Sequence, residues 1–234
     1  MKINVDDQKK LWIVSDTHFN HKKLCTSYPD HFDAPRKYAT IEEMNHDIVT
    51  RWNATVGKND QVIMLGDWFM GTPFNELRDR FLAARKALNG NIIAYVAGNH
   101  DEKLMKVAPE IAWLDRVEFE YHGRHYICQH RDFIELPVRG VTPTPELVLV
   151  HGHTHSFEKT SQCALGTQNN VCWEARYDLA NADDLCSVTE ELINVDLEDE
   201  VLESLASKAK EKGVPLANFV KSLLEKAIKE QKND

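Results

Sequence analysis

Residues that can bind a divalent metal ion stand in short clusters along the chain. The densest cluster is His151-Gly152-His153-Thr154-His155, which follows the apolar run Leu147–Val150. Such a run indicates a buried strand, and in extended backbone residues two apart point to the same side. We therefore expect His153 and His155 to converge at the end of a strand, where Gly152 allows close backbone approach.

Similar polar residues follow other apolar runs. The runs and the residues after them are Leu11–Val14 with Asp16 and His18, Gln61–Leu65 with Asp67, Ile92–Val96 with Asn99, and His125–Cys128 with His130. Carboxylate, imidazole and amide groups without a thiolate suit ions such as Mn²⁺, Fe²⁺ or Zn²⁺. The set is too large for one catalytic metal with an open position. It suits two ions about 3.5–4 Å apart, an arrangement that serves displacement at phosphorus.

Helical patterns separate these strands. Thr40 and Glu43 form a capping box that predicts the start of one helix. Thr72 as N-cap and Pro73 at the first position predict a second helix, which runs to about Leu88. Alternating strands and helices predict an α/β sheet. Ligands of such sheets bind beyond the carboxyl ends of the strands, which is where the polar residues lie.

The sequence pattern after residue 115 indicates strands and loops rather than further helices, up to about residue 188. Residues 116–129 fit a hairpin that turns at His122-Gly123-Arg124. Residues 156–169 fit a polar loop, and Val171 to Tyr177 fit a closing strand. The second strand of the hairpin leads to the candidate ligand His130.

Composition sets the outer bounds. At 234 residues the chain allows one large domain with a small appendage. The net charge of −9 disfavours a surface that coats nucleic acid. The 5 cysteines are scattered and odd in number, which argues against a disulfide framework and favours a reducing cytoplasm. No apolar run approaches the ~18 residues that a membrane span requires, and no signal-peptide pattern opens the chain.

Taken together, the motifs resemble the calcineurin-like metallophosphoesterase family. They are Asp16-x-His18, Gly66-Asp67, Gly98-Asn99-His100-Asp101, His130 and Gly152-His153-x-His155, in the family's order. The stretches Ser15–Phe19, Leu65–Asp67 and Asn169–Trp173 further resemble a bacterial and phage branch of small phosphoesterases. The resemblance implies a four-layer αββα sandwich with a dinuclear centre, which we assign to residues 1–188.

The resemblance also implies a role for each motif residue. The ligands of one metal would be Asp16, His18, Asp67 and His155, and those of the other Asp67, Asn99, His130 and His153. The bridging ligand would be Asp67. His100 would contact the phosphate or protonate the leaving oxygen, and Asp101 would orient His100. Mn²⁺ is the expected ion, with Fe, Zn or Ni as alternatives.

The implied reaction is hydrolysis of a phosphate ester in a small molecule or a nucleotide. A hydroxide that bridges the two metals would attack phosphorus in line. A phosphodiester is the preferred substrate, and a phosphomonoester is the alternative. A non-catalytic scaffold would be expected to lack ligands, and none of the motif ligands is missing.

Three further residues are candidates for substrate contact. Arg36 matches an arginine of the same branch, and Arg131 follows a predicted ligand. Each would either grip a phosphate oxygen or form a surface salt bridge. His21 flanks the first motif closely enough to reach the site.

Residues 189–234 resemble a ribbon-helix-helix module. Ile193, Val195 and Leu197 give one apolar face to a short strand, and two amphipathic helices follow. So small a unit buries its apolar faces poorly alone, which predicts pairing with a second copy in a homodimer. From Ser187 to Asp234 there are seven Lys and no Arg against eleven acidic residues. That balance disfavours phosphate contact, so a DNA-binding regulator or nuclease is the weaker alternative.

Overall fold

The computed structural model describes residues 1–26, 36, 38–189, 201, 204–208, 220 and 223. The chain forms two compact units, Met1–Glu191 and Leu192–Asp234. In the second unit the described residues are helical. The predicted strand at 193–197 lies outside the described residues, as does most of the two predicted helices.

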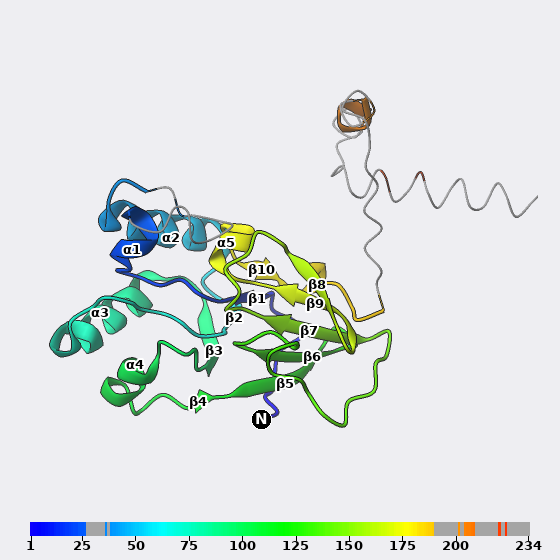
Figure 1. Ribbon diagram of the computed structural model, residues 1–234, viewed down its shortest axis with the longest axis horizontal. Coiled ribbons are helices and arrows are strands. Elements are labelled where there is room, and N and C mark those ends of the chain that lie inside the picture. Colours follow the sequence, from blue (N-terminus) through cyan, green and yellow to red (C-terminus); the bar gives the residue numbers. More distant parts are fainter. Residues whose placement is uncertain are drawn as a thin grey trace, which may run out of the picture. The chain divides into compact units, whose positions relative to one another are not determined.

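The first unit contains two five-stranded sheets with helices beside the first of them (Figure 1). The first sheet has the order β10 (Ala180–Asn181), β1 (Leu11–Val14), β2 (Gln61–Met64), β3 (Asn91–Val96) and β4 (Trp113–Leu114). The second has the order β5 (Arg116–Tyr121), β6 (Arg124–Gln129), β7 (Leu147–His151), β9 (Gly166–Asn170) and β8 (Thr160–Cys163). The helices are α1 (Lys22–Thr26), α2 (Ile41–Thr55), α3 (Phe74–Ala87), α4 (Glu102–Val107) and α5 (Trp173–Arg176), with a 3₁₀ turn at Ala182–Asp184. This is an α/β fold of the sandwich type expected.

Strand alternation divides the core into layers. In β1, Trp12 and Val14 pack with the helices, whereas Leu11 and Ile13 pack between the two sheets, because successive side chains of a strand point to opposite faces. A third cluster, which includes Phe133, covers the outer face of the second sheet. Among the described residues this outer layer is built by the segment between β6 and β7 rather than by a helix.

Parallel pairing collects the strand ends at one edge. β1, β2 and β3 are parallel neighbours in the first sheet, and β6, β7 and β9 are parallel neighbours in the second. A bridge between Ser15 and Cys172 joins the two sheets just beyond β1 and β9. The polar residues that follow these strands are therefore carried to a common place.

The helix starts follow the sequence in one case and not in the other. As predicted, Thr40 caps α2, with its hydroxyl accepting a hydrogen bond from the Glu43 backbone N–H at 3.1 Å. The predicted cap of α3 is wrong, because the helix begins at Phe74 with Pro73 as its N-cap. The Thr72 hydroxyl instead accepts a hydrogen bond from the Asn20 side chain at 2.9 Å.

The predicted loop at 156–169 and the predicted strand at 171–177 are both wrong. β8 and most of β9 occupy the first segment, and α5 occupies the second. β9 escaped detection because its buried residues include amides rather than aliphatic groups. Their hydrogen bonds are satisfied inside the fold: Gln168 accepts from the Phe133 backbone N–H at 2.8 Å, and Asn169 donates to the Leu149 carbonyl at 3.0 Å.

No helix among the described residues is long and apolar enough to cross a membrane.

Candidate metal centre

The backbone turns sharply at most of the predicted ligands. Left-handed φ angles occur at Asp16 (58°), His18 (46°), Asp67 (57°), His153 (70°) and His155 (48°). Such angles are costly for residues other than glycine, and they concentrate at functional sites. They also overturn one expectation, because His153 and His155 are not in extended backbone and their rings do not converge on one point.

Asp67 lies at the middle of the site. Its Oδ2 is 3.6 Å from the Nε2 of His18 and also 3.6 Å from the Nε2 of His130. Each histidine belongs to a separate group of potential ligands. One carboxylate oxygen is therefore placed between the two groups.

The first group comprises Asp16, His18 and His155. The Nε2 atoms of the two histidines are 3.2 Å apart. Asp16 Oδ1 lies 3.7 Å from His18 Nε2 and 3.5 Å from His155 Nε2. Asp16 and His18 are fully enclosed by protein. Three donor atoms therefore surround one small space next to Asp67.

The second group surrounds His130. Its Nδ1 lies 2.8 Å from the Leu65 carbonyl oxygen, so the proton belongs on Nδ1 and the lone pair on Nε2. That Nε2 is 2.9 Å from Asn99 Oδ1. The His153 ring stands 5.0 Å from the His130 ring, and its Nε2 lies 3.4 Å from a carboxylate oxygen of Glu135.

The donor set fits divalent cations. Asp16 Oδ2 accepts hydrogen bonds from the His153 backbone N–H at 2.8 Å and the Cys172 thiol at 3.2 Å. Asp16 Oδ1 is buried without a hydrogen-bond partner in the part of the chain that the structure describes. An unbonded buried carboxylate oxygen is costly, and a cation would satisfy it.

The pKa values of Asp16 and Asp67 also favour a bound cation. Burial opposes ionisation of Asp16, but the nearby histidines, His130 foremost, hold its pKa below the ordinary value. Burial and the charge of Asp16 together raise the pKa of Asp67 to about 7. Two close carboxylates are both ionised at neutral pH only when positive charge lies between them. The residues therefore fit the metal ions that the motifs imply.

Glycines let the ligand turns approach one another. A Cβ at Gly98 would overlap the Asp67 carboxylate, and a Cβ at Gly152 would overlap the Ser15 hydroxyl. Gly66, with φ of 93°, packs its Cα against the backbone of Gly98. The expected role of Gly152 in close backbone approach is thus confirmed.

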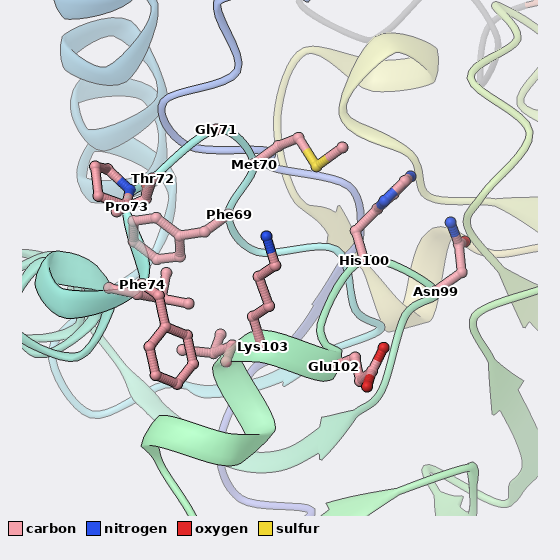
Figure 2. Close-up of a pocket in the computed structure, with 12 residues that line it drawn as sticks. Phe69, Met70, Gly71, Thr72, Pro73, Phe74, Asn99, His100, Glu102 and Lys103 are labelled. Atoms are coloured by element: carbon pink, nitrogen blue, oxygen red, sulfur yellow. The ribbon is translucent and has the colours of Figure 1, made fainter.

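His100 lies at the edge of this centre. Its backbone N–H donates to Asp67 Oδ1 at 2.8 Å, and its ring stands 5.6 Å from the His18 ring. Partial burial lowers the pKa of His100, which makes its protonated ring a stronger acid. Together with Asn99 it lines a pocket of about 560 Å³ (Figure 2).

Asp101 has a different contact from the one predicted. Its Oδ2 accepts hydrogen bonds from the backbone N–H groups of Asp67 at 2.7 Å and Gly98 at 2.9 Å, and its Oδ1 accepts from Trp68. The carboxylate therefore ties the Asp67 turn to the turn before His100. Among the described residues, Asp101 accepts no hydrogen bond from the His100 ring.

Arg36 is neither a free phosphate clamp nor a surface residue. It is buried, and its Nε donates to Glu174 Oε1 at 2.7 Å. Its two terminal nitrogens donate to the backbone carbonyls of Asp16 and Thr17. All of these contacts hold the turn that carries the first ligands, so the expected substrate contact is not supported.

Glu174 is the site residue that the sequence analysis missed. Its Oε1 also lies 3.1 Å from His155 Nδ1, on the side of the ring away from the metal group. The charge of Arg36 keeps the pKa of Glu174 below its ordinary value despite complete burial, and the contact with Glu174 raises the pKa of His155 although burial opposes this. The available signal was its place directly after the Asn169–Trp173 stretch.

Arg131 and His21 have separate outcomes. Arg131 forms a partly exposed ion pair with Glu135, four residues later in the turn after β6, which is the surface salt bridge considered as the alternative. The His21 ring stands 5.3 Å from the His18 ring. Burial and the charge of Arg36 lower the pKa of His21 to about 4, so it would meet a substrate as a neutral ring.

Comparison with known proteins identifies the families of the two parts of the chain. The family model for calcineurin-like phosphoesterases matches residues 9–212, and that for the CopG-like RHH_1 or ribbon-helix-helix domain matches residues 193–232. The uncharacterized protein MJ1445 of Methanocaldococcus jannaschii is 30% identical over 154 residues, which is 63% of this chain and 70% of that protein.

Two solved structures were matched to this chain. A protein of unknown function, AQ665 from Aquifex aeolicus, matches with a TM-score of 0.53 and 20% identity, over 75% of this chain and 97% of that one. Yfce, a phosphoesterase from E. coli, matches with a TM-score of 0.40 and 16% identity, over 69% of this chain and 78% of that one.

Proposed function

The chain belongs to the calcineurin-like phosphoesterase family, a family of hydrolases acting on phosphoester bonds, and on that premise we propose that it is a dinuclear, metal-dependent phosphodiesterase. The observation that carries the proposal is the position of Asp67 Oδ2 at 3.6 Å from both His18 and His130. One carboxylate oxygen between two ligand groups is the arrangement that two bridged cations need.

The proposed ligands divide around that carboxylate. One ion would be held by Asp16, His18, Asp67 and His155, and the other by Asp67, Asn99, His130 and His153. When bound, the two ions, Mn²⁺ in this proposal, would lower the pKa of water and offset the charge of the phosphoryl oxygens. Two groups of residues lie close enough to hold a metal ion, which supports the proposal. One group is Asp16, His18 and His155, and the other is Asp16, Asp67 and His130.

The charges around the site favour a diester. Arg36 is buried against Glu174, and Arg131 pairs with Glu135. Neither guanidinium is available for the bidentate grip that suits a phosphate dianion. A phosphodiester carries one negative charge fewer than an ionised monoester, so it needs fewer cationic side chains to balance its charge.

In the proposed reaction, an oxygen of water forms a bond to phosphorus while the bond to the leaving oxygen breaks. The leaving oxygen takes up a proton, which we assign to the protonated ring of His100 at the edge of the centre, and the proton that the attacking water gives up restores that ring. His100 is held there by its backbone bond to Asp67. Asp101 supports the chemistry as a positioning residue, because it fixes the two turns that carry Asp67 and Asn99.

The direct test is hydrolysis of matched esters by metal-loaded protein. We expect higher kcat/KM for bis(4-nitrophenyl) phosphate than for 4-nitrophenyl phosphate, with loss of both activities on chelation and recovery with Mn²⁺. A preference for the monoester would replace the diester proposal with a phosphomonoesterase. Absence of metal-dependent hydrolysis of either ester would overturn the proposed function.

The remaining part of the proposal concerns the ribbon-helix-helix-like domain at the C-terminal end. We assign residues 1–188 to catalysis and 189–234 to dimerisation. The acidic balance of this segment supports pairing with a second copy rather than contact with DNA. The cytoplasm remains the proposed location, because the 5 cysteines are scattered and odd in number.

A further inference from the structure

The pocket beside His100 has no role in the reaction described so far. We propose that this pocket binds the leaving group of the substrate, and this proposal rests on the phosphodiesterase activity proposed above. The leaving group would be an aromatic ring with an anionic substituent. The proposal names a substrate class and two residues outside the metal centre, Phe74 and Lys103, that select it.

Position links the pocket to the reacting bond. Asn99 and His100 line the pocket, and both also belong to the metal centre. A group that leaves phosphorus beside His100 therefore has this space next to it. The volume of about 560 Å³ is in the range of small-molecule sites, and it would accept a ring system rather than a methyl group.

The opposite wall is apolar and aromatic. It is formed by the segment between β2 and α3 and by the first residue of α3, and its lining includes Phe69, Met70 and Phe74 (Figure 2). Phe69 is buried, whereas Phe74 is 55% exposed. An aromatic side chain that lines a cavity and is half open to solvent can stack on a flat ligand.

A cation completes the pocket. The side chain of Lys103 extends from α4 into the space between Phe69 and His100 (Figure 2). The neighbouring carboxylate of Glu102 is paired with Lys106 at 2.6 Å, so its charge is already balanced. Of the described residues that line the pocket, Lys103 is the one with a cationic side chain. It would favour a negatively charged substituent on the ring.

The test uses leaving groups that differ in one property. Methyl 4-carboxyphenyl phosphate and methyl 4-carbamoylphenyl phosphate present the same ring with and without a negative charge. Lys103→Gln should lower kcat/KM for the carboxylate about 10-fold and leave the carbamoyl ester unchanged. Phe74→Ala should lower both about 3- to 10-fold, but should not lower kcat/KM for methyl trifluoroethyl phosphate.

Lys86→Gln is the matched control, because Lys86 is an exposed lysine in the last turn of α3 outside the pocket lining. It should behave as the unmodified protein on all three esters. If the unmodified protein hydrolyses the esters and the variants keep its preferences, the leaving-group pocket is refuted while the phosphodiesterase stands. If the unmodified protein hydrolyses none of them with metal, both proposals fall.

Discussion

Replacing Glu174 by Gln should weaken both the fold and the metal centre. The side chain is buried, and one of its oxygens contacts Arg36 Nε at 2.7 Å and His155 Nδ1 at 3.1 Å. Glutamine keeps the size but removes the charge, which leaves the Arg36 guanidinium buried without a counterion. Breaking a buried pair in this way typically costs about 3–5 kcal/mol.

The same change should lower metal affinity by about 10- to 100-fold, because a carboxylate behind a ligating histidine orients its ring and raises its basicity. Urea unfolding of the metal-free protein would measure the first effect. Titration of Mn²⁺ into folded protein by calorimetry would measure the second. The two measurements separate a loss of stability from a loss of ligand orientation.

A matched exposed pair supplies the control. Glu110 pairs with Arg78 at 2.9 Å, and both side chains are about half exposed. Glu110→Gln should therefore lower stability far less than Glu174→Gln does, and it should leave Mn²⁺ affinity unchanged. If Glu174→Gln were no more destabilising than Glu110→Gln, or if it bound Mn²⁺ as tightly as the unmodified protein, the reasoning about the buried pair would be refuted.

Four further outcomes are expected. Asp67→Asn should nearly abolish turnover and lower metal content measured by mass spectrometry, and a variant with full turnover and two metals per chain would contradict the bridging role. His100→Ala should retain metal and lose about 10²–10⁴-fold in kcat, less for nitrophenolate leaving groups; equal losses across leaving groups would indicate phosphate binding instead. Mn²⁺ affinity should rise from about pH 5.5 to about pH 8, since metal competes with the proton that Asp67, with its pKa raised to about 7, still binds below neutrality. Deleting residues 190–234 should convert a dimer into a monomer by light scattering while metal content persists, and a monomeric full-length protein would refute the dimer.

Much of the architecture could be predicted locally. Apolar runs such as Leu11–Val14 predicted the strands, because a strand buried on both faces needs apolar residues at successive positions. The capping box at Thr40 predicted the start of α2, since it satisfies backbone groups within one turn. The parallel α/β pattern then placed the motif residues at one edge of the sheets.

Tertiary structure decided how the motif residues meet. His153 and His155 are two residues apart, yet left-handed backbone turns their rings toward different groups. Gly152, next to His153, packs against Ser15, and strand pairing creates that contact. No periodicity within the segment carries this information.

The buried charges give the same lesson over a longer range. Arg36 and Glu174 are 138 residues apart in sequence, so neither residue by itself predicts its partner. Asp101 was expected to serve the side chain next to it, but its oxygens are taken by backbone N–H groups that the approach of β2 and β3 brings within reach. The sequence alone determined which chemical groups the site contains and which strand ends carry them. Only the folded chain decided which groups touch, because those contacts arise from strand pairing and from burial that excludes water.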